Sequence, residues 1–213
     1  MSFRNQIEEI FQGKAFARPL FYSYPAGLRF ELSESGTAIE MFLLALQKAR
    51  LICDDLFPEE GSLVVCLRGY SDALPSAYRP LYSELKAAGI KIPKDRCYWV
   101  EPAPREEWFD ENVPQCWSSV AFHAPLSQLQ NLLWCAMAHD FGYIQPHLSC
   151  AIYLFNLEQQ VMALPYDDRG MDVVGPNREV LLGLYQKYPQ YLLDHDRPEM
   201  DETFGTPADD PSC

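Results

Sequence analysis

The order of hydrophobic and polar positions predicts several helices. Residues 3–12 carry apolar side chains at helical spacing, and a longer helix is expected after Thr37. Thr37 and Glu40 have the spacing of a capping box, and an apolar series follows them. Further helices are predicted near Pro80, after Pro125 and after Asn177, where an apolar stripe follows a residue that suits the start of a helix.

Short apolar runs between these helices predict strands. They cover residues 28–32, 63–67, 97–100, 117–122, 151–155, 160–164 and 171–174. The continuously apolar run 63–67 is typical of a strand covered on both faces, so we expect it to be central. The runs 151–155 and 160–164 have the spacing of a hairpin.

The distribution of these elements indicates the fold class. Strands are concentrated between residues 117 and 174, which favours an α+β fold with a mixed or largely antiparallel sheet covered by helices. A parallel pairing among the strands of residues 28–100 stays open. The 213 residues, 48% of them hydrophobic, are enough for one domain, which we expect over residues 1–197. Residues 198–213 are acidic and poor in apolar side chains, and we expect a mobile tail there.

Composition narrows the classes of function. The formal charge of −13 disfavours binding to nucleic acid or to a membrane surface, and no apolar run reaches the roughly 20 residues that span a bilayer. The amino terminus lacks the pattern of a secretion signal, so we expect a cytoplasmic protein. The charge has two interpretations: an acidic face that attracts a basic partner, or solubility alone.

An acidic, aromatic segment is a candidate partner site. Residues 101–114 have no clear hydrophobic period and predict a surface loop. Within it, a partner could contact Glu106, Glu107, Trp108, Asp110 and Glu111, with the indole as an anchor. The alternative is that the aromatic side chain packs back onto the domain.

The densest cluster of charge is the stretch Tyr166–Val173, which holds Asp167, Asp168, Arg169 and Asp172. These four residues are predicted to form a structural brace at a tight connection between strands, where Asp and Gly170 suit a turn. The alternative makes the three carboxylates metal ligands or a general base, with the guanidinium binding an anionic substrate.

A second charged cluster follows the last strong helix. Asp194, His195 and Asp196 have a composition that binds divalent metal ions or orients an imidazole, but the same residues are also common at helix ends. We include Asp194 and Asp196 in the candidate partner surface. Motifs for a nucleophilic serine and for phosphate binding are missing from the sequence, so we assign no catalytic residue, no metal site and no cofactor.

The two charged clusters together resemble an uncharacterised bacterial domain family, with the signature Y-D-D-R-G-M-D-V in residues 166–173 and L-D-x-D-R in residues 193–197. Small acidic bacterial proteins of this sort resemble immunity proteins. The resemblance implies a binding protein that occludes a cognate basic toxin. Two alternatives stay open: a metal-assisted hydrolase or transferase that uses the carboxylates and His195, and a structural or regulatory homodimer.

Overall fold

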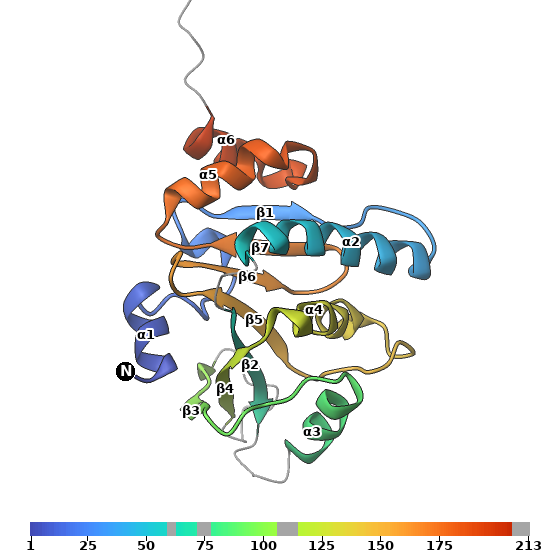
Figure 1. Ribbon diagram of the computed structural model, residues 1–213. Coiled ribbons are helices and arrows are strands. Elements are labelled where there is room, and N and C mark those ends of the chain that lie inside the picture. The colour runs from blue at the N-terminus through green and yellow to red at the C-terminus, as the bar shows by residue number, and fades with distance from the viewer. Residues whose placement is uncertain (59–62, 72–77, 106–114, 206–213) are drawn as a thin grey trace, which may run out of the picture.

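The computed structural model describes residues 1–58, 63–71, 78–105 and 115–205. Within these ranges seven strands form one open antiparallel sheet, in the order β1-β7-β6-β5-β2-β4-β3 (Figure 1). The strands are β1 (Leu28–Glu31), β2 (Leu63–Ser71), β3 (Cys97–Pro102), β4 (Cys116–Ala124), β5 (Ala151–Asn156), β6 (Val161–Pro165) and β7 (Gly170–Val174). The predicted α+β class is confirmed, and the strands of residues 28–100 have only antiparallel partners.

Helices cover both faces of this sheet. They are α1 (Phe3–Ile10), α2 (Ala38–Leu56), α3 (Tyr78–Ala87), α4 (Leu129–Met137), α5 (Arg178–Lys187) and α6 (Arg197–Phe204). Side chains of α2, α3 and α4 share one apolar cluster with one face of the sheet, whereas α1 and the segment after it cover the other face. Figure 1 shows α5 and α6 beyond the β1 edge. None of the helices in the described ranges has both the length and the apolar character needed to cross a membrane.

Strand β2 lies inside the sheet, as its continuous apolar run predicted. It pairs with β4 on one side and with β5 on the other. Val65 belongs to the cluster under α2 and α4, whereas Val64 and Cys66 belong to the cluster under α1. Both faces of β2 are therefore covered, which explains why the run lacks an alternation of apolar and polar residues.

Two helix starts form as the sequence predicted. Before α2, the Thr37 side chain accepts a hydrogen bond from the Glu40 backbone N–H, while the Glu40 carboxylate accepts from the Thr37 backbone N–H at 2.9 Å. Before α5, the Asn177 side chain accepts from the Val180 backbone N–H at 3.3 Å. Each cap satisfies an amide that has no partner within its helix, which sets the first residue of the helix.

The carboxy-terminal region differs from the expected tail over residues 198–204. These residues belong to α6, whose Met200 and Phe204 are 1% and 5% exposed and join the core cluster. Two apolar residues one helical turn apart suffice to dock a short helix, although they give only a weak signal in an acidic sequence. Residues 206–213 lie outside the described residues, so a tail there stays a prediction.

Candidate functional site

The sequence-predicted partner residues separate into three groups. Those from 106 to 111 lie outside the described residues. Asp194 is exposed, as a contact residue should be. Asp196 is 5% exposed and its carboxylate is engaged inside the protein, so we remove it from the candidate partner surface.

Asp167 organises the connection between β6 and β7. Its carboxylate accepts from the backbone N–H groups of Arg169 at 2.8 Å and Gly170 at 3.2 Å, and from the Arg169 guanidinium. A Cβ at Gly170 would lie 1.9 Å from the Tyr166 hydroxyl oxygen, so a larger residue there would require the Tyr166 side chain to move. The connection is therefore a hairpin turn in which a carboxylate satisfies the turn amides, as its composition suggested.

Asp168 binds a different part of the chain. The Ser33 hydroxyl donates to the Asp168 carbonyl oxygen at 2.9 Å and lies 3.3 Å from its carboxylate. The Asp168 side chain is buried, and this burial raises the pKa of its carboxyl above the usual value. The residue thus links the β6–β7 turn to the segment after β1.

Arg29 joins the two charged clusters that the sequence separates. Its guanidinium donates to the Asp172 carboxylate at 2.8 Å and to the Asp196 carboxylate at 3.0 Å. The Tyr22 hydroxyl donates to Asp196 at 2.6 Å, and the Phe21 backbone N–H donates to Asp172 at 3.1 Å. Burial nevertheless keeps the pKa of the Asp172 carboxyl above its usual value.

The backbone brings these groups together from three parts of the chain. Arg29 of β1 stands opposite Asp172 of β7 in the antiparallel register. The chain after α5 returns to β1, where the Leu193 backbone N–H donates to the Arg29 carbonyl at 2.9 Å, and Asp196 follows three residues later. Sequence analysis missed Arg29, because the alternation of apolar and charged residues in 28–32 places its side chain on the solvent face of a half-buried strand.

This arrangement does not gather the carboxylates into one metal-like cluster. Asp167 faces the turn amides, Asp168 faces Ser33, and only Asp172 and Asp196 share a partner. His195 is exposed. Among the described residues, no group of three or more His, Cys, Asp and Glu side chains is placed to hold a metal ion.

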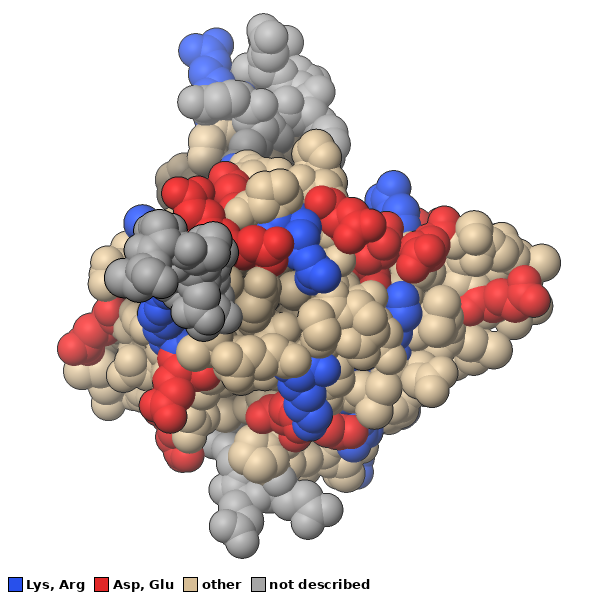
Figure 2. All heavy atoms as spheres, turned by 90° about the horizontal axis from the view of Figure 1, so that it is seen from above, with Lys and Arg blue, Asp and Glu red and all other residues tan. Residues whose placement is uncertain are grey.

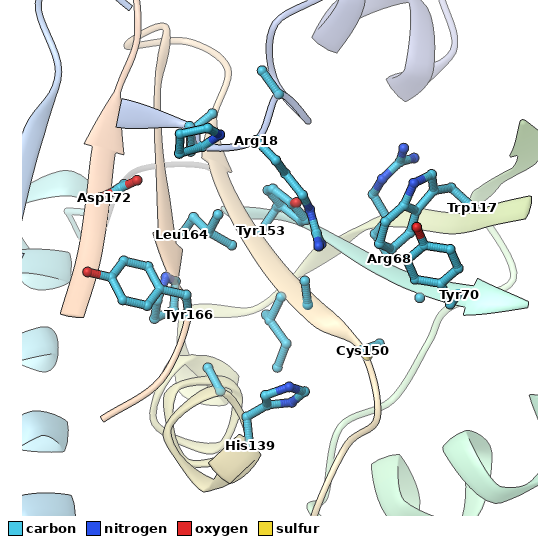
Figure 3. A pocket seen from close by; sticks show the side chains of 18 of the residues that line it. Arg18, Arg68, Tyr70, Trp117, His139, Cys150, Tyr153, Leu164, Tyr166 and Asp172 are labelled. Atoms are coloured by element: carbon cyan, nitrogen blue, oxygen red, sulfur yellow. The ribbon is translucent and has the colours of Figure 1, made fainter. Parts of the chain in front are cut away.

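A cavity of about 700 Å³ lies on the face of the sheet that α1 covers (Figure 3). Its floor follows neighbouring strands. Arg29 pairs with Asp172 across the register, Asp172 pairs with Leu164, and Tyr153 of β5 pairs with Cys66 of β2. The segment 17–20, the strand residues Arg68 and Trp117 and the end of α4 complete the lining.

An exposed apolar surface runs along α2. Ile39, Leu43, Leu44 and Leu51 are 66%, 54%, 39% and 42% exposed, and we call this set the α2 surface. These residues lie on the arc of the helix opposite to the buried stripe that includes Phe42 and Ile52. The exposed side of α2 thus carries four apolar residues among polar ones such as Glu40, Gln47 and Asp54, where an amphipathic helix usually carries polar residues alone.

On the face seen in Figure 2, the acidic side chains of the described residues do not form one continuous patch. Figure 2, viewed toward the side of α5 and α6, shows red acidic groups separated by uncharged surface and by several basic groups. Arg50 pairs with Asp54 on α2, and Lys187 of α5 pairs with Asp55.

Comparison with known proteins gives one match. The family described as "Domain of unknown function (DUF3885)" matches residues 3–196, a span that includes Arg29 and both charged clusters. This confirms the resemblance to an uncharacterised domain family. A search of curated proteins and a search of solved structures found no match.

Proposed function

We propose that this chain, which belongs to the family described as Domain of unknown function (DUF3885), is a binding protein of the immunity type. It binds and occludes a basic partner protein, a toxin that the same cell meets. The α2 surface is the main contact, and Asp194 belongs to the acidic surroundings. The exposed apolar arc of α2 is the observation that carries this proposal.

The α2 surface has the composition of a contact region. Single exposed apolar residues are ordinary on protein surfaces, but here they recur along one helix from Ile39 to Leu51. Burying a side chain such as Leu43 against a partner contributes roughly 1.5–3 kcal/mol, so a few such contacts suffice for a specific complex. A partner that fits this arc presents an apolar groove with basic residues around it.

The net charge of −13 supports a basic partner. A surplus of acidic groups accelerates encounter with a positively charged protein, even when the acids are spread over the surface. Asp54 and Asp55 lie on α2 beside the apolar residues, where exposed ion pairs with Arg50 and Lys187 contribute only weakly to holding them. These carboxylates are therefore available to a competing cation.

The charged clusters of residues 167–172 and 194–196 have a different role in this proposal. Asp167, Asp168, Asp172 and Asp196 each bind groups of the protein itself. They hold the β6–β7 turn, β1 and the carboxy-terminal segment in one arrangement. We propose this bracing role for them in place of the metal-assisted hydrolysis considered above. A metal-dependent activity that is lost in Asp168→Ala and in Asp196→Ala would support hydrolysis instead.

The test combines capture with protection. The full chain is used to capture basic proteins from the cells that produce it, and each captured protein is expressed alone and together with this chain. We expect one captured protein to arrest growth and the wild-type chain to restore it. Leu43→Asp should abolish both capture and protection, because a charge replaces an apolar contact at the centre of the α2 surface.

Val100→Asp is the matched control. Val100 is 40% exposed on β3, at the sheet edge opposite β1, so the same change of polarity occurs far from α2. This variant should capture and protect like the wild type. The proposal fails if no captured protein is toxic, or if Leu43→Asp protects as well as the wild type while its circular dichroism spectrum is native. A mass that rises with concentration and returns to the monomer value in Leu43→Asp would favour the homodimer instead.

A further inference from the structure

The cavity between segment 17–20 and the Tyr153 face of the sheet has the size of a ligand site. Its volume of about 700 Å³ falls within the roughly 300–1,000 Å³ that is usual for pockets that bind small molecules. Leu20 and Leu164, 2% and 9% exposed, contribute apolar walls, while polar atoms converge from neighbouring strands. Figure 3 shows Tyr153 and Arg18 in the middle of the cavity, with Asp172 on one side and Trp117 on the other.

The Tyr153 hydroxyl is an unused polar group in this cavity. Tyr153 is 0% exposed, and its hydroxyl oxygen has no hydrogen-bond partner among the described residues. A buried hydroxyl without a partner destabilises the folded protein, so most buried tyrosines bond to a protein group. A partner from outside the chain would remove this cost.

Arg18 supplies a positive charge beside that hydroxyl. Three arginines line the cavity, and two of them are already paired: Arg29 with Asp172 and Asp196, and Arg68 with Glu101 at 2.5 Å. Arg18 forms no ion pair within the described part of the chain, and its guanidinium lies 4.4 Å from the centre of the Trp117 ring. Burial raises the pKa of the Tyr153 phenol, and the Arg18 guanidinium opposes this rise.

We infer that this cavity binds a small organic anion. The anionic group, a carboxylate or a phosphate, accepts hydrogen bonds from the Arg18 guanidinium and the Tyr153 hydroxyl, and the apolar part of the ligand contacts Leu20 and Leu164. Trp117 holds the Arg18 side chain over its ring and so limits the entropy that the contact costs. This site is independent of the α2 surface and of any protein partner.

Titration calorimetry with simple probes tests the inference. The full chain is titrated with benzoate, with phenyl phosphate and with uncharged benzyl alcohol. We expect at least one of the two anions to bind, and benzyl alcohol to bind at least tenfold more weakly. The preferred anion identifies the ligand as a carboxylate or as a phosphate ester.

Two variants locate the site and one controls for charge. Arg18→Gln and Tyr153→Phe should each weaken binding about tenfold or more, because a charge-assisted hydrogen bond contributes about 1.5–3 kcal/mol and 1.4 kcal/mol corresponds to tenfold. Arg96→Gln removes the same charge from an exposed position before β3 and should bind like the wild type. Thermal melting separates lost contact from lost fold: Tyr153→Phe should melt no lower than the wild type, because its hydroxyl has no partner in the described protein.

Three results would overturn the inference. The first is that neither anion binds at millimolar concentration. The second is that Arg18→Gln and Tyr153→Phe keep wild-type affinity, or that Arg96→Gln loses as much as they do. The third is that Tyr153→Phe melts clearly below the wild type, which would mean that the hydroxyl already serves the folded protein itself.

Discussion

At the scale of single residues, Arg29 is the cation that joins the two charged clusters. It is the common cation of Asp172 and Asp196, whose side chains are 3% and 4% exposed. Its guanidinium also lies over the rings of Phe21 and Tyr22. A buried ion pair adds little when compared with apolar packing, but the removal of one partner leaves the other charge without compensation in a medium of low polarity.

Arg29→Met should therefore destabilise the protein strongly. It leaves two buried carboxylates without their cation, and we expect a loss of about 3–5 kcal/mol in the free energy of unfolding, measured with urea. Arg169→Met is the matched control, because Arg169 is 67% exposed and its ion pairs are worth less than about 1 kcal/mol. Equal losses in the two variants would show that the Arg29 cluster has no special structural role.

At the scale of elements, local sequence and tertiary contact set different helix boundaries. The start of α2 is written in the sequence, because Thr37 and Glu40 satisfy each other's backbone groups within four residues. The extent of α6 cannot be read from the sequence, because Met200 and Phe204 stabilise the helix only when they pack against the core of the folded protein. The two helices therefore call for different tests.

Thr37→Ala should shorten the start of α2. We expect a loss of about 1 kcal/mol in the free energy of unfolding, as is usual for an N-cap hydroxyl. The Thr37 backbone N–H and hydroxyl hold the pKa of the Glu40 carboxyl below its usual value, so this stabilisation is present above the unfolded pKa and disappears as pH falls through the folded one. Carboxyl NMR titration should show the Glu40 pKa rising in the variant. An unchanged pKa would contradict this account.

The contribution of α6 can be measured by truncation. A chain that stops after Asp196 loses Met200 and Phe204 from the core, and we expect about 1.5–3 kcal/mol of stability to be lost for each of these buried side chains. A chain that stops after Gly205 keeps both, and its urea midpoint should equal that of the wild type. If the two truncations melt alike, α6 does not belong to the folded domain.

At the scale of the whole molecule, net charge and apolar surface would act at different stages of binding in the proposed complex. The charge of −13 acts at a distance and is screened within about 10 Å at 0.1 M salt. The α2 surface acts only on contact. A complex built in this way has a rate of association that depends on salt and a rate of dissociation that depends on apolar burial.

Surface plasmon resonance with the captured partner measures these two stages. Between low salt and about 0.5 M salt the association rate constant should fall by at least tenfold, while the dissociation rate constant changes little. Leu44→Ala, which keeps the charge and removes apolar area, should raise the dissociation rate and leave the salt dependence unchanged. Association that is insensitive to salt would argue against a basic partner.

The sequence by itself determined the local elements of this protein. The hydrophobic pattern places the strands, the caps at Thr37 and Asn177 place two helices, and the turn composition of residues 167–170 places a hairpin, because each depends on neighbours a few residues apart. Only the tertiary structure decided which charges meet. Arg29, Asp172 and Asp196 come from an edge strand, its neighbour and the returning chain, and their contact follows from register and not from spacing.

The candidate sites also depend on contacts between segments that are far apart in the sequence. The cavity collects Arg18, Tyr153 and Leu164 from different segments, so neither its volume nor the unpartnered hydroxyl has a signature in the linear chain. Ile39 and Leu43 belong to the apolar series that predicts the helix after Thr37, and only packing shows which side of that helix is covered. Short-range patterns specify elements, whereas sites arise where elements meet.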